Sequence, residues 1–224
     1  MTGADSFDAL LAARSSCRAF LPDPVDRSII EAILASAQKT ASWCNSQPWQ
    51  LFITTGAATD RFRAAYAAAA DRSAPNPDFE FPSEYSGVYG QRRRECGRLL
   101  YESLGIERGD RARAQEAARD NYRFFGAPHV AIVTSPADLG LYGAIDCGAY
   151  VHNFMLAAKS RGVASIAQAA LARHPKVIRR HFGMAPDRRV VCGISFGYAD
   201  PVHPANAFRT PRAAIAEAAH FFEV

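Results

Sequence analysis

The sequence is poor in lysine, in cysteine and in long apolar runs. Only Lys39, Lys159 and Lys176 are lysines, so arginine carries nearly all of the positive charge. The five cysteines are scattered and form no CxxC pair, which argues against a disulfide framework and favours a reducing cytoplasm. No segment approaches the roughly 18 uninterrupted apolar residues of a membrane span, and Met1–Asp8 lacks the features of a signal peptide. We therefore expect a cytoplasmic protein without a membrane partner.

Several motifs of catalysis and ligand binding are also missing. The six histidines show neither an HExxH pattern nor short ligand spacing, so no metal site is expected. Without a GxGxxG or Walker sequence, a nicotinamide nucleotide would not bind on a Rossmann fold. Ser195 lies in a GxSxG pattern, but proline-rich sequence follows where a nucleophile elbow needs a helix. The net charge of +4 is small, and Arg92–Arg94 fits a solvated helix face, so no nucleic-acid partner is expected.

The remaining composition is that of a single globular domain spanning residues 1–224. Hydrophobic residues make up 49% of the chain and charged residues 21%, enough to bury a core without disulfides or metals. Periodicity predicts helices at residues 8–14, 26–39, 59–70, 84–104, 110–124, 141–161 and 175–182, and strands at 49–55, 130–134 and 189–198. Residues 165–171 are ambiguous. This order predicts an α+β layer fold with a helical insertion at about residues 57–126.

Four segments carry the candidate binding residues. Residues 14–18 combine two arginines with two serines, a set that suits phosphate oxygens. Residues 42–49 supply amides, hydroxyls and indoles that could contact the rim and face of a planar heterocycle. Residues 162–171 are small enough for a ligand to approach the backbone, and residues 206–212 add two arginines in a proline-bounded loop. Taken singly, each segment also has a purely structural interpretation.

Together and in this order, the four segments resemble the FMN-dependent nitroreductase family. The specific motifs are Arg-Ser-Ser-x-Arg at 14–18 and Ser-x-x-Asn-x-Gln-Pro-Trp at 42–49. Ser-Ile-Ala-Gln-Ala-Ala-Leu at 165–171, the strand end at 193–198 and Asn-x-x-Arg-x-x-Arg at 206–212 support them. The resemblance runs from about Phe7 to the end of the chain. It implies a nitroreductase-like α+β fold, with a small central sheet surrounded by helices, in a domain-swapped homodimer that binds FMN at the subunit interface.

The resemblance also implies where the phosphate of FMN binds. It assigns the phosphate and the nearby flavin edge to two groups of residues from opposite ends of the chain: Arg14, Ser15, Ser16 and Arg18, and Arg209 and Arg212. The family often supplies a further polar group before the middle strand, and Asn121 and Arg123 are candidates whose register the sequence leaves open.

Two further segments are matched to the flavin ring. Ser42, Trp43 and Asn45 resemble a loop that reaches the flavin of the partner subunit. Gln168 and Ala169 resemble the segment beside the redox-active flavin nitrogen, where the backbone N–H of Ala169 would point at that nitrogen. No side chain is assigned as an indispensable acid, base or nucleophile.

The implied activity is that of a flavin oxidoreductase. NADH or NADPH would reduce FMN, and a small electron-poor acceptor such as a nitroaromatic compound or a quinone would then take the electrons. Two alternatives stay open at this point. One keeps FMN but catalyses dehydrogenation or reductive removal of a substituent, with the acceptor pocket built by residues 57–126. The other is a cofactor-free, arginine-rich binding protein.

Overall fold

The chain folds around a four-stranded antiparallel sheet. The computed structural model describes residues 2–222, and its strands are β1 (Gln50–Thr55), β2 (His129–Pro136), β3 (Ala164–Gln168) and β4 (Arg188–Gly197). They are arranged in the order β1-β2-β4-β3, so β2 and β4 are the central strands. Every residue of β2 from His129 to Ser135 is buried, because apolar layers cover both faces of the sheet.

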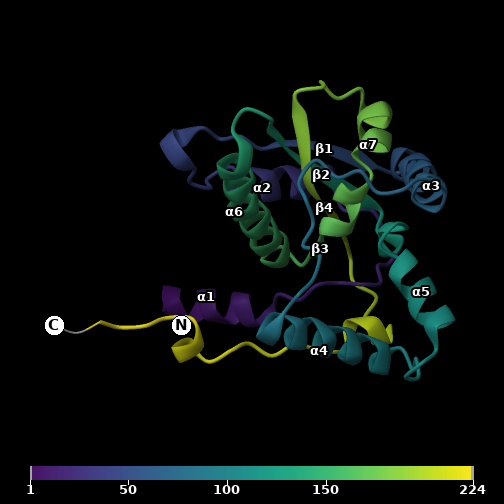
Figure 1. Cartoon of the computed structure of the whole chain (residues 1–224). Helices are drawn as coiled ribbons and strands as arrows, with labels where there is room; N and C mark the ends of the chain where they lie inside the picture. Colours follow the sequence, from purple (N-terminus) through teal and green to yellow (C-terminus); the bar gives the residue numbers. More distant parts are fainter. Residues whose placement is uncertain (1, 223–224) are drawn as a thin grey trace.

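Helices surround this sheet and confirm the expected α+β class. In the part of the chain that the structure describes they are α1 (Gly3–Ala13), α2 (Arg27–Ala37), α3 (Ala57–Arg72), α4 (Gly87–Ser103), α5 (Arg111–Arg119), α6 (Gly140–Lys159) and α7 (Pro175–Phe182). Helices α2 and α6 lie to one side of the sheet and α3 and α7 to the other, with α1 and α4 below (Figure 1). Short 3₁₀ turns complete the chain: η1 (Trp43–Asn45), η2 (Phe124–Gly126), η3 (Ala169–Arg173), η4 (Pro204–Asn206) and η5 (Ile215–Glu217).

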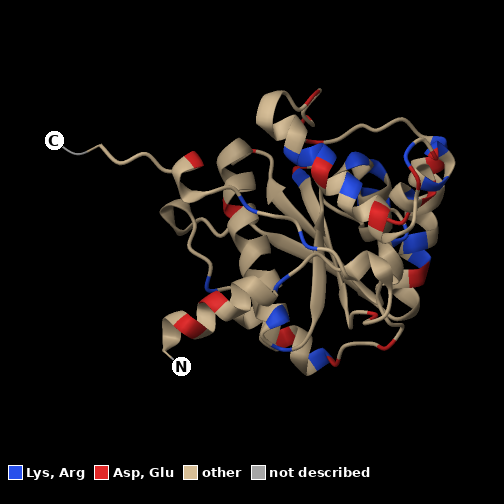
Figure 2. Ribbon diagram, turned by 90° about the horizontal axis from the view of Figure 1, so that it is seen from below, with Lys and Arg blue, Asp and Glu red and all other residues tan. Residues whose placement is uncertain are grey.

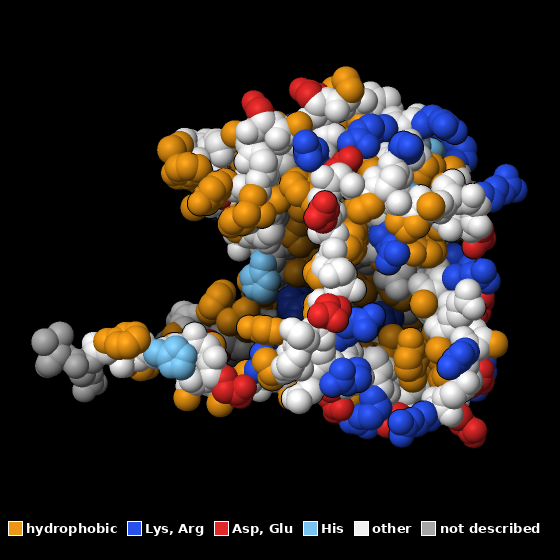
Figure 3. Space-filling view, in the orientation of Figure 1, with side chains coloured by type: hydrophobic (Ala, Val, Ile, Leu, Met, Phe, Trp, Pro, Cys, Tyr) orange, Lys and Arg blue, Asp and Glu red, His pale blue; other side chains and the backbone are white. Residues whose placement is uncertain are grey.

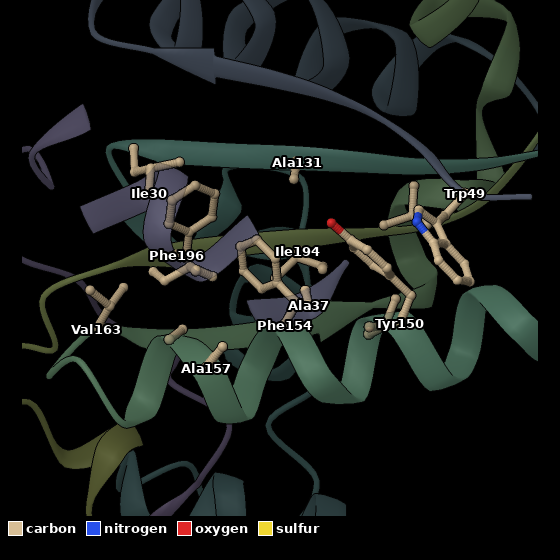
Figure 4. Packing of buried hydrophobic residues seen from close by; sticks show 14 of the residues in the cluster. Ile30, Ala37, Trp49, Ala131, Tyr150, Phe154, Ala157, Val163, Ile194 and Phe196 are labelled. Carbon is tan, nitrogen blue, oxygen red and sulfur yellow. The ribbon is translucent and has the colours of Figure 1, made fainter. Parts of the chain in front are cut away.

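Two apolar layers flank the sheet, and β2 contributes to both. Alternate residues between Val130 and Val133 belong to opposite layers, as the two-residue period of a strand requires. On the α6 side, Tyr150 packs against Trp49 and Phe154 against Phe196, at ring-centroid distances of 4.9 and 5.4 Å (Figure 4). Full burial of each large apolar side chain contributes about 1.5–3 kcal/mol, so these contacts hold α6 firmly on the sheet.

Two helix boundaries differ most from those that the apolar pattern predicts, the start of α1 and the end of α5. Helix α1 begins earlier, because Thr2 and Asp5 form a capping box in which each backbone N–H donates to the other side chain. Helix α5 ends earlier, at Arg119, and the residues up to η2 form turns in place of the predicted last helical turn. Within η2, Phe124 and Phe125 adopt φ values of 59° and 52°. Left-handed backbone is not helical, and hydrophobic periodicity carries no signal for it.

The segment between β1 and β2 contains α3, α4 and α5, which pack differently. Helix α3 buries Thr59, Phe62 and Tyr66 and forms part of the core layer. Helix α4 buries only Gly90, and α5 buries no residue. Charges of both signs are interspersed along the helices, whereas the strands carry few (Figure 2). Among residues 2–222, no helix combines the length and apolarity needed to cross a membrane.

Candidate functional site

The segment that follows α1 and a segment near residue 206 lie side by side. The N-terminal segment that follows α1 is attached to β3, because the backbone N–H of Cys17 donates to the carbonyl of Ser165 at 3.1 Å. The C-terminal segment is attached through Asn206, whose Oδ1 accepts from the backbone N–H of Arg18 at 2.7 Å and whose Nδ2 donates to the carbonyl of Ala19 at 2.9 Å. Through these hydrogen bonds, Asn206 joins the two segments that carry the predicted phosphate-binding residues.

A basic cavity of about 390 Å³ opens between these two segments, and we call it the arginine pocket. Six residues predicted from the sequence line it: Arg14, Ser15, Ser16, Arg18, Arg209 and Arg212. Cys96 of α4 and Phe208 also line it, and sequence reasoning missed both. A second cavity of about 270 Å³ adjoins the arginine pocket and includes Lys159 and Asp200.

The electrostatics of the arginine pocket suit an anion. None of its four arginines forms an ion pair with a carboxylate among residues 2–222. Desolvation lowers the pKa of Arg14, and the nearby charge of Arg212 lowers it further. Desolvation also lowers the pKa of Arg18, whose guanidinium lies 5.2 Å from the ring centroid of Phe208. Crowding like charges without counter-charges costs free energy, which a bound anion would offset.

Ser42, Trp43 and Asn45 lie away from the arginine pocket. Their loop is anchored on α6, because the carboxylate of Asp146 accepts from the backbone N–H of Trp43 at 3.2 Å. The indole of Trp43 packs against Tyr142 with ring centroids 4.8 Å apart, yet the residue remains 64% exposed. Within one chain, the structure therefore does not bring this loop together with the phosphate-binding candidates.

The same loop has an unusual backbone. Cys44, Asn45 and Gln47 adopt φ values of 52°, 55° and 45°, although left-handed backbone is unfavourable for residues other than glycine. The second tryptophan of the motif has a structural role, because Trp49 is only 8% exposed and its indole N–H donates to Gln38 at 3.1 Å. Of the two indoles considered for a heterocycle, only Trp43 is accessible.

The third predicted segment forms a turn between β3 and η3, which we call the β3–η3 turn (Gln168–Leu171). The side chain of Gln168 points into the protein and is 2% exposed, whereas Ala169 is exposed. Since Ala169 opens η3, its N–H has no acceptor within that turn, and no other backbone acceptor is found for it among residues 2–222. Its role beside a flavin stays a prediction.

Asn121 and Arg123 have different surroundings. Asn121 lies beside the β3–η3 turn, because its carbonyl accepts from Nε2 of Gln168 at 2.9 Å. Arg123 is exposed and donates to the carboxylates of Glu116 and Asp120. Asn121 is therefore the nearer of the two candidates to the predicted flavin-binding segment.

The remaining motifs do not form catalytic sites. Ser195 lies inside β4 and is fully buried, so its GxSxG pattern is not a nucleophile elbow. In the described residues, no three side chains of His, Cys, Asp or Glu gather as metal ligands. Sequence reasoning did not select Asn206, Phe208 or Cys96 as site residues. Asn206 and Phe208 lie inside a motif that the sequence had already indicated, whereas Cys96 lines the pocket only because of the way α4 packs.

Comparison with known proteins identifies the fold. The model of the family described as "Nitroreductase family" matches residues 11–198. The chain belongs to the nitroreductase family. It is 33% identical over 217 residues to the 4-nitrobenzoate reductase of Pseudomonas putida, covering 97% of this chain and 96% of that one. It is 35% identical over 219 residues to nitroreductase NfnB of Mycolicibacterium smegmatis, covering 97% and 93%.

A solved structure agrees with this assignment along almost the whole chain. The crystal structure of the FMN-dependent nitroreductase NfnB from Mycobacterium smegmatis in complex with NADPH matches with a TM-score of 0.93 at 35% identity. The match covers 98% of this chain and 99% of that chain. The nitroreductase resemblance seen in the sequence motifs is therefore confirmed at the level of family and fold.

Proposed function

We propose that this nitroreductase-family protein is an FMN-dependent oxidoreductase that uses NADH or NADPH to reduce nitroaromatic compounds. The observation that carries the proposal is the arginine pocket, which is lined by four arginines together with Ser15 and Ser16. Within residues 2–222, none of these arginines has a carboxylate partner. Guanidinium groups bind phosphate oxygens through paired, charge-assisted hydrogen bonds, so this donor set fits the phosphate of FMN. The named activities of the two relatives, and the FMN and NADPH named for the solved structure, point the same way.

In this proposal, the residues of the arginine pocket and those of the β3–η3 turn bind different parts of the cofactor. The arginines and serines that line the pocket would hold the phosphate. The β3–η3 turn presents the N–H of Ala169, and the small exposed side chains of Ala167 and Ala169 leave room for a planar ring. When bound, FMN supplies the electron transfer between nucleotide and acceptor, whereas the protein supplies orientation and hydrogen bonds.

The proposal includes a homodimer, supported by an exposed apolar patch. Leu141, Tyr142 and Ile145 on α6 are 68%, 59% and 55% exposed, and Trp43 packs beside them. Contiguous apolar surface of this kind commonly marks a protein interface. Figure 3 shows apolar side chains bordering a hollow between the α6 side of the molecule and the α1 side. A second copy that covers this patch would carry the loop of Ser42, Trp43 and Asn45 to the partner's flavin.

The first experiment is spectroscopic. The purified protein should show a flavin spectrum, bind FMN more tightly than riboflavin, and lose its yellow colour when NADPH or NADH is added in a stopped-flow instrument. It should then be reoxidised by 4-nitrobenzoate or nitrobenzene. A protein that binds no flavin would support the cofactor-free alternative. A flavin that is reduced but not reoxidised by nitroaromatics would favour the other redox chemistry.

A second experiment tests the dimer. Sedimentation of the wild-type protein should give a dimer at nanomolar concentration, as expected when an obligate interface of about 2,000–5,000 Å² is buried. Ile145→Glu should shift the protein toward monomer and weaken FMN binding. The control is Gln91→Glu, an equally charged change on exposed α4. A monomeric wild type that binds FMN fully would contradict the shared site.

The five cysteines are all free, which supports a reducing cytoplasmic location.

A further inference from the structure

A line of buried polar groups lies behind the β3–η3 turn. The hydroxyl of Ser195 on β4 donates to Oε1 of Gln168 at 2.5 Å. Nε2 of Gln168 donates to the backbone carbonyl of Asn121 at 2.9 Å and approaches its Oδ1 at 3.3 Å. Ser195 is fully buried, and Gln168 is 2% exposed. Three segments that are distant in sequence are thus joined through one carboxamide.

The chemistry of the three groups determines which atom donates and which accepts in each of these hydrogen bonds. A backbone carbonyl can only accept, so the NH₂ group of Gln168 must face Asn121 and its Oε1 must face Ser195. The hydroxyl of Ser195 can then act only as the donor in this pair. Both ends of the carboxamide are therefore engaged, and its orientation has no alternative that keeps both hydrogen bonds.

Two further contacts immobilise the same turn. The hydroxyl of Tyr66 on α3 donates to the carbonyls of Ala170 at 3.2 Å and Leu171 at 2.8 Å. Leu171 packs into the space left by Gly193, where an added Cβ would lie 2.4 Å from Cδ1 of Leu171. Contacts with α3 and β4 thus restrain the turn on its buried side, while Ala169 is exposed on the opposite side.

Stability alone does not require this polar line. Replacing two hydrogen-bonded partners by apolar groups of similar shape is often nearly neutral, whereas leaving one partner unsatisfied costs about 1–3 kcal/mol. What a satisfied network adds over apolar packing is a unique geometry, because each bond fixes a direction. The network ends at the segment whose backbone N–H is proposed to face the flavin.

We propose that Ser195 is a positioning residue of the redox site. Acting through Gln168, it fixes the β3–η3 turn so that the N–H of Ala169 is held in a single position toward FMN. This inference rests on the proposed function, since it assumes that FMN lies beside the turn. At neutral pH the reduced cofactor carries a negative charge that the oxidised cofactor lacks, so a fixed N–H dipole favours the reduced form. Loosening the turn should therefore lower the reduction potential of bound FMN.

The test compares two variants that each remove one buried hydroxyl. Ser195→Ala removes the donor to Gln168. Thr59→Val is the matched control, because Thr59 is 1% exposed and its hydroxyl contacts Thr54 and Pro128, away from the turn. We expect Ser195→Ala to weaken binding of reduced FMN about tenfold more than binding of oxidised FMN. For a two-electron couple, that lowers the midpoint potential by about 30 mV. Thr59→Val should leave the potential at the wild-type value.

A double-mutant cycle tests whether Ser195 acts through Gln168. It also provides a second comparison in case the Ser195→Ala variant is unstable. Gln168→Met keeps the side-chain length but removes both hydrogen-bonding ends. In the Gln168→Met background, Ser195→Ala should change the potential no further, since coupled residues give non-additive effects. Full additivity, or equal potentials for wild type and Ser195→Ala, would overturn the inference.

The proposed function and this inference fail in different ways. A wild-type protein that binds no FMN would refute the proposed function and, with it, the inference. A wild-type protein that binds FMN, but whose potential is the same in Ser195→Ala and in Thr59→Val, would leave the proposed function intact and refute only the role of Ser195.

Discussion

The arginine pocket and the β3–η3 turn are built in opposite ways. The pocket gathers charged side chains from two ends of the chain around a cavity. The turn exposes backbone and is held from behind by buried, neutral side chains. Charge attraction acts over several ångströms and tolerates small displacements, whereas a backbone donor is effective only within a narrow range of distance and angle. Affinity for the cofactor should therefore depend mainly on the pocket, and reactivity mainly on the turn.

The largest expected effect removes the backbone donor of the turn. Ala169→Pro deletes the N–H at the first residue of η3, where proline is tolerated. Gln168 before it is already extended, as a residue preceding proline prefers. FMN reduction by NADPH, followed in a stopped-flow instrument, should slow about 100- to 1,000-fold, by analogy with the loss of one preorganised donor. Ala169→Gly keeps the N–H and should stay near wild type. Equal rates in the two variants would show that this N–H has no role.

The next effect removes a charge from the pocket. Arg14→Ala should weaken FMN binding about 10- to 150-fold, since a hydrogen bond to a charged group contributes about 1.5–3 kcal/mol. Riboflavin, which lacks the phosphate, should bind wild type and variant equally. Arg27→Ala is the control, because Arg27 is exposed and pairs with Glu31 on the surface. Fluorescence titration at two salt concentrations measures both ligands. If Arg14→Ala weakened riboflavin as much as FMN, the arginine would not be reading the phosphate.

A smaller effect concerns the clamp behind the turn. Burial raises the pKa of Tyr66, so its hydroxyl stays protonated and donates to Ala170 and Leu171. Tyr66→Phe leaves those carbonyls without this donor and should lower the free energy of unfolding by about 1–3 kcal/mol. Tyr89→Phe, on a residue that is 66% exposed, should have no measurable effect. Denaturant unfolding gives the free energies, and the comparison fails if both variants are equally stable.

The smallest expected effect is on the pH dependence of stability, and it arises from a buried histidine of the core. His129 is 2% exposed, and its Nε2 accepts from the backbone N–H of Val25 at 2.9 Å. Burial lowers its pKa, so folding favours the neutral ring. Its contribution to stability is present above the unfolded pKa of about 6.5 and is lost as the pH falls below that value.

Unfolding of the apoprotein between pH 5 and pH 7.5 measures this effect. His129→Gln should remove the contribution of one proton to the slope of stability against pH. His152→Gln, at an exposed position of α6, is the control, because it removes an imidazole that is not buried. An unchanged slope in His129→Gln would show that other groups are responsible for the acid sensitivity.

Local sequence was sufficient wherever a feature depends on neighbouring residues. The central strands were predicted from dense apolar runs, because a strand covered on both faces needs apolar residues at nearly every position. The arginines and serines of residues 14–18 stood out because guanidinium and hydroxyl groups have a direct chemical relation to phosphate. The structure places six of the predicted residues around one pocket, and their contact with FMN stays a prediction.

Contacts between distant segments were out of reach of the sequence. Arg18 and Asn206 are 188 residues apart, and Ser195 and Gln168 are 27 apart. Side chains such as those of Asn206 and Ser195 have many possible partners, and only the folded chain selects one. Hydrophobic periodicity also carries no signal for the left-handed residues of η1 and η2.

From the sequence by itself came the α+β class, which follows from periodicity, and the residue types that suit a phosphate. The family came from the resemblance of four local motifs to the nitroreductase family. The tertiary structure decided which charges share a pocket, that Trp49 belongs to the core while Trp43 is accessible, and that Gln168 points inward while Ala169 faces outward. The physical reason is that burial and hydrogen-bond pairing depend on which distant segments pack together, and only the whole fold settles that packing.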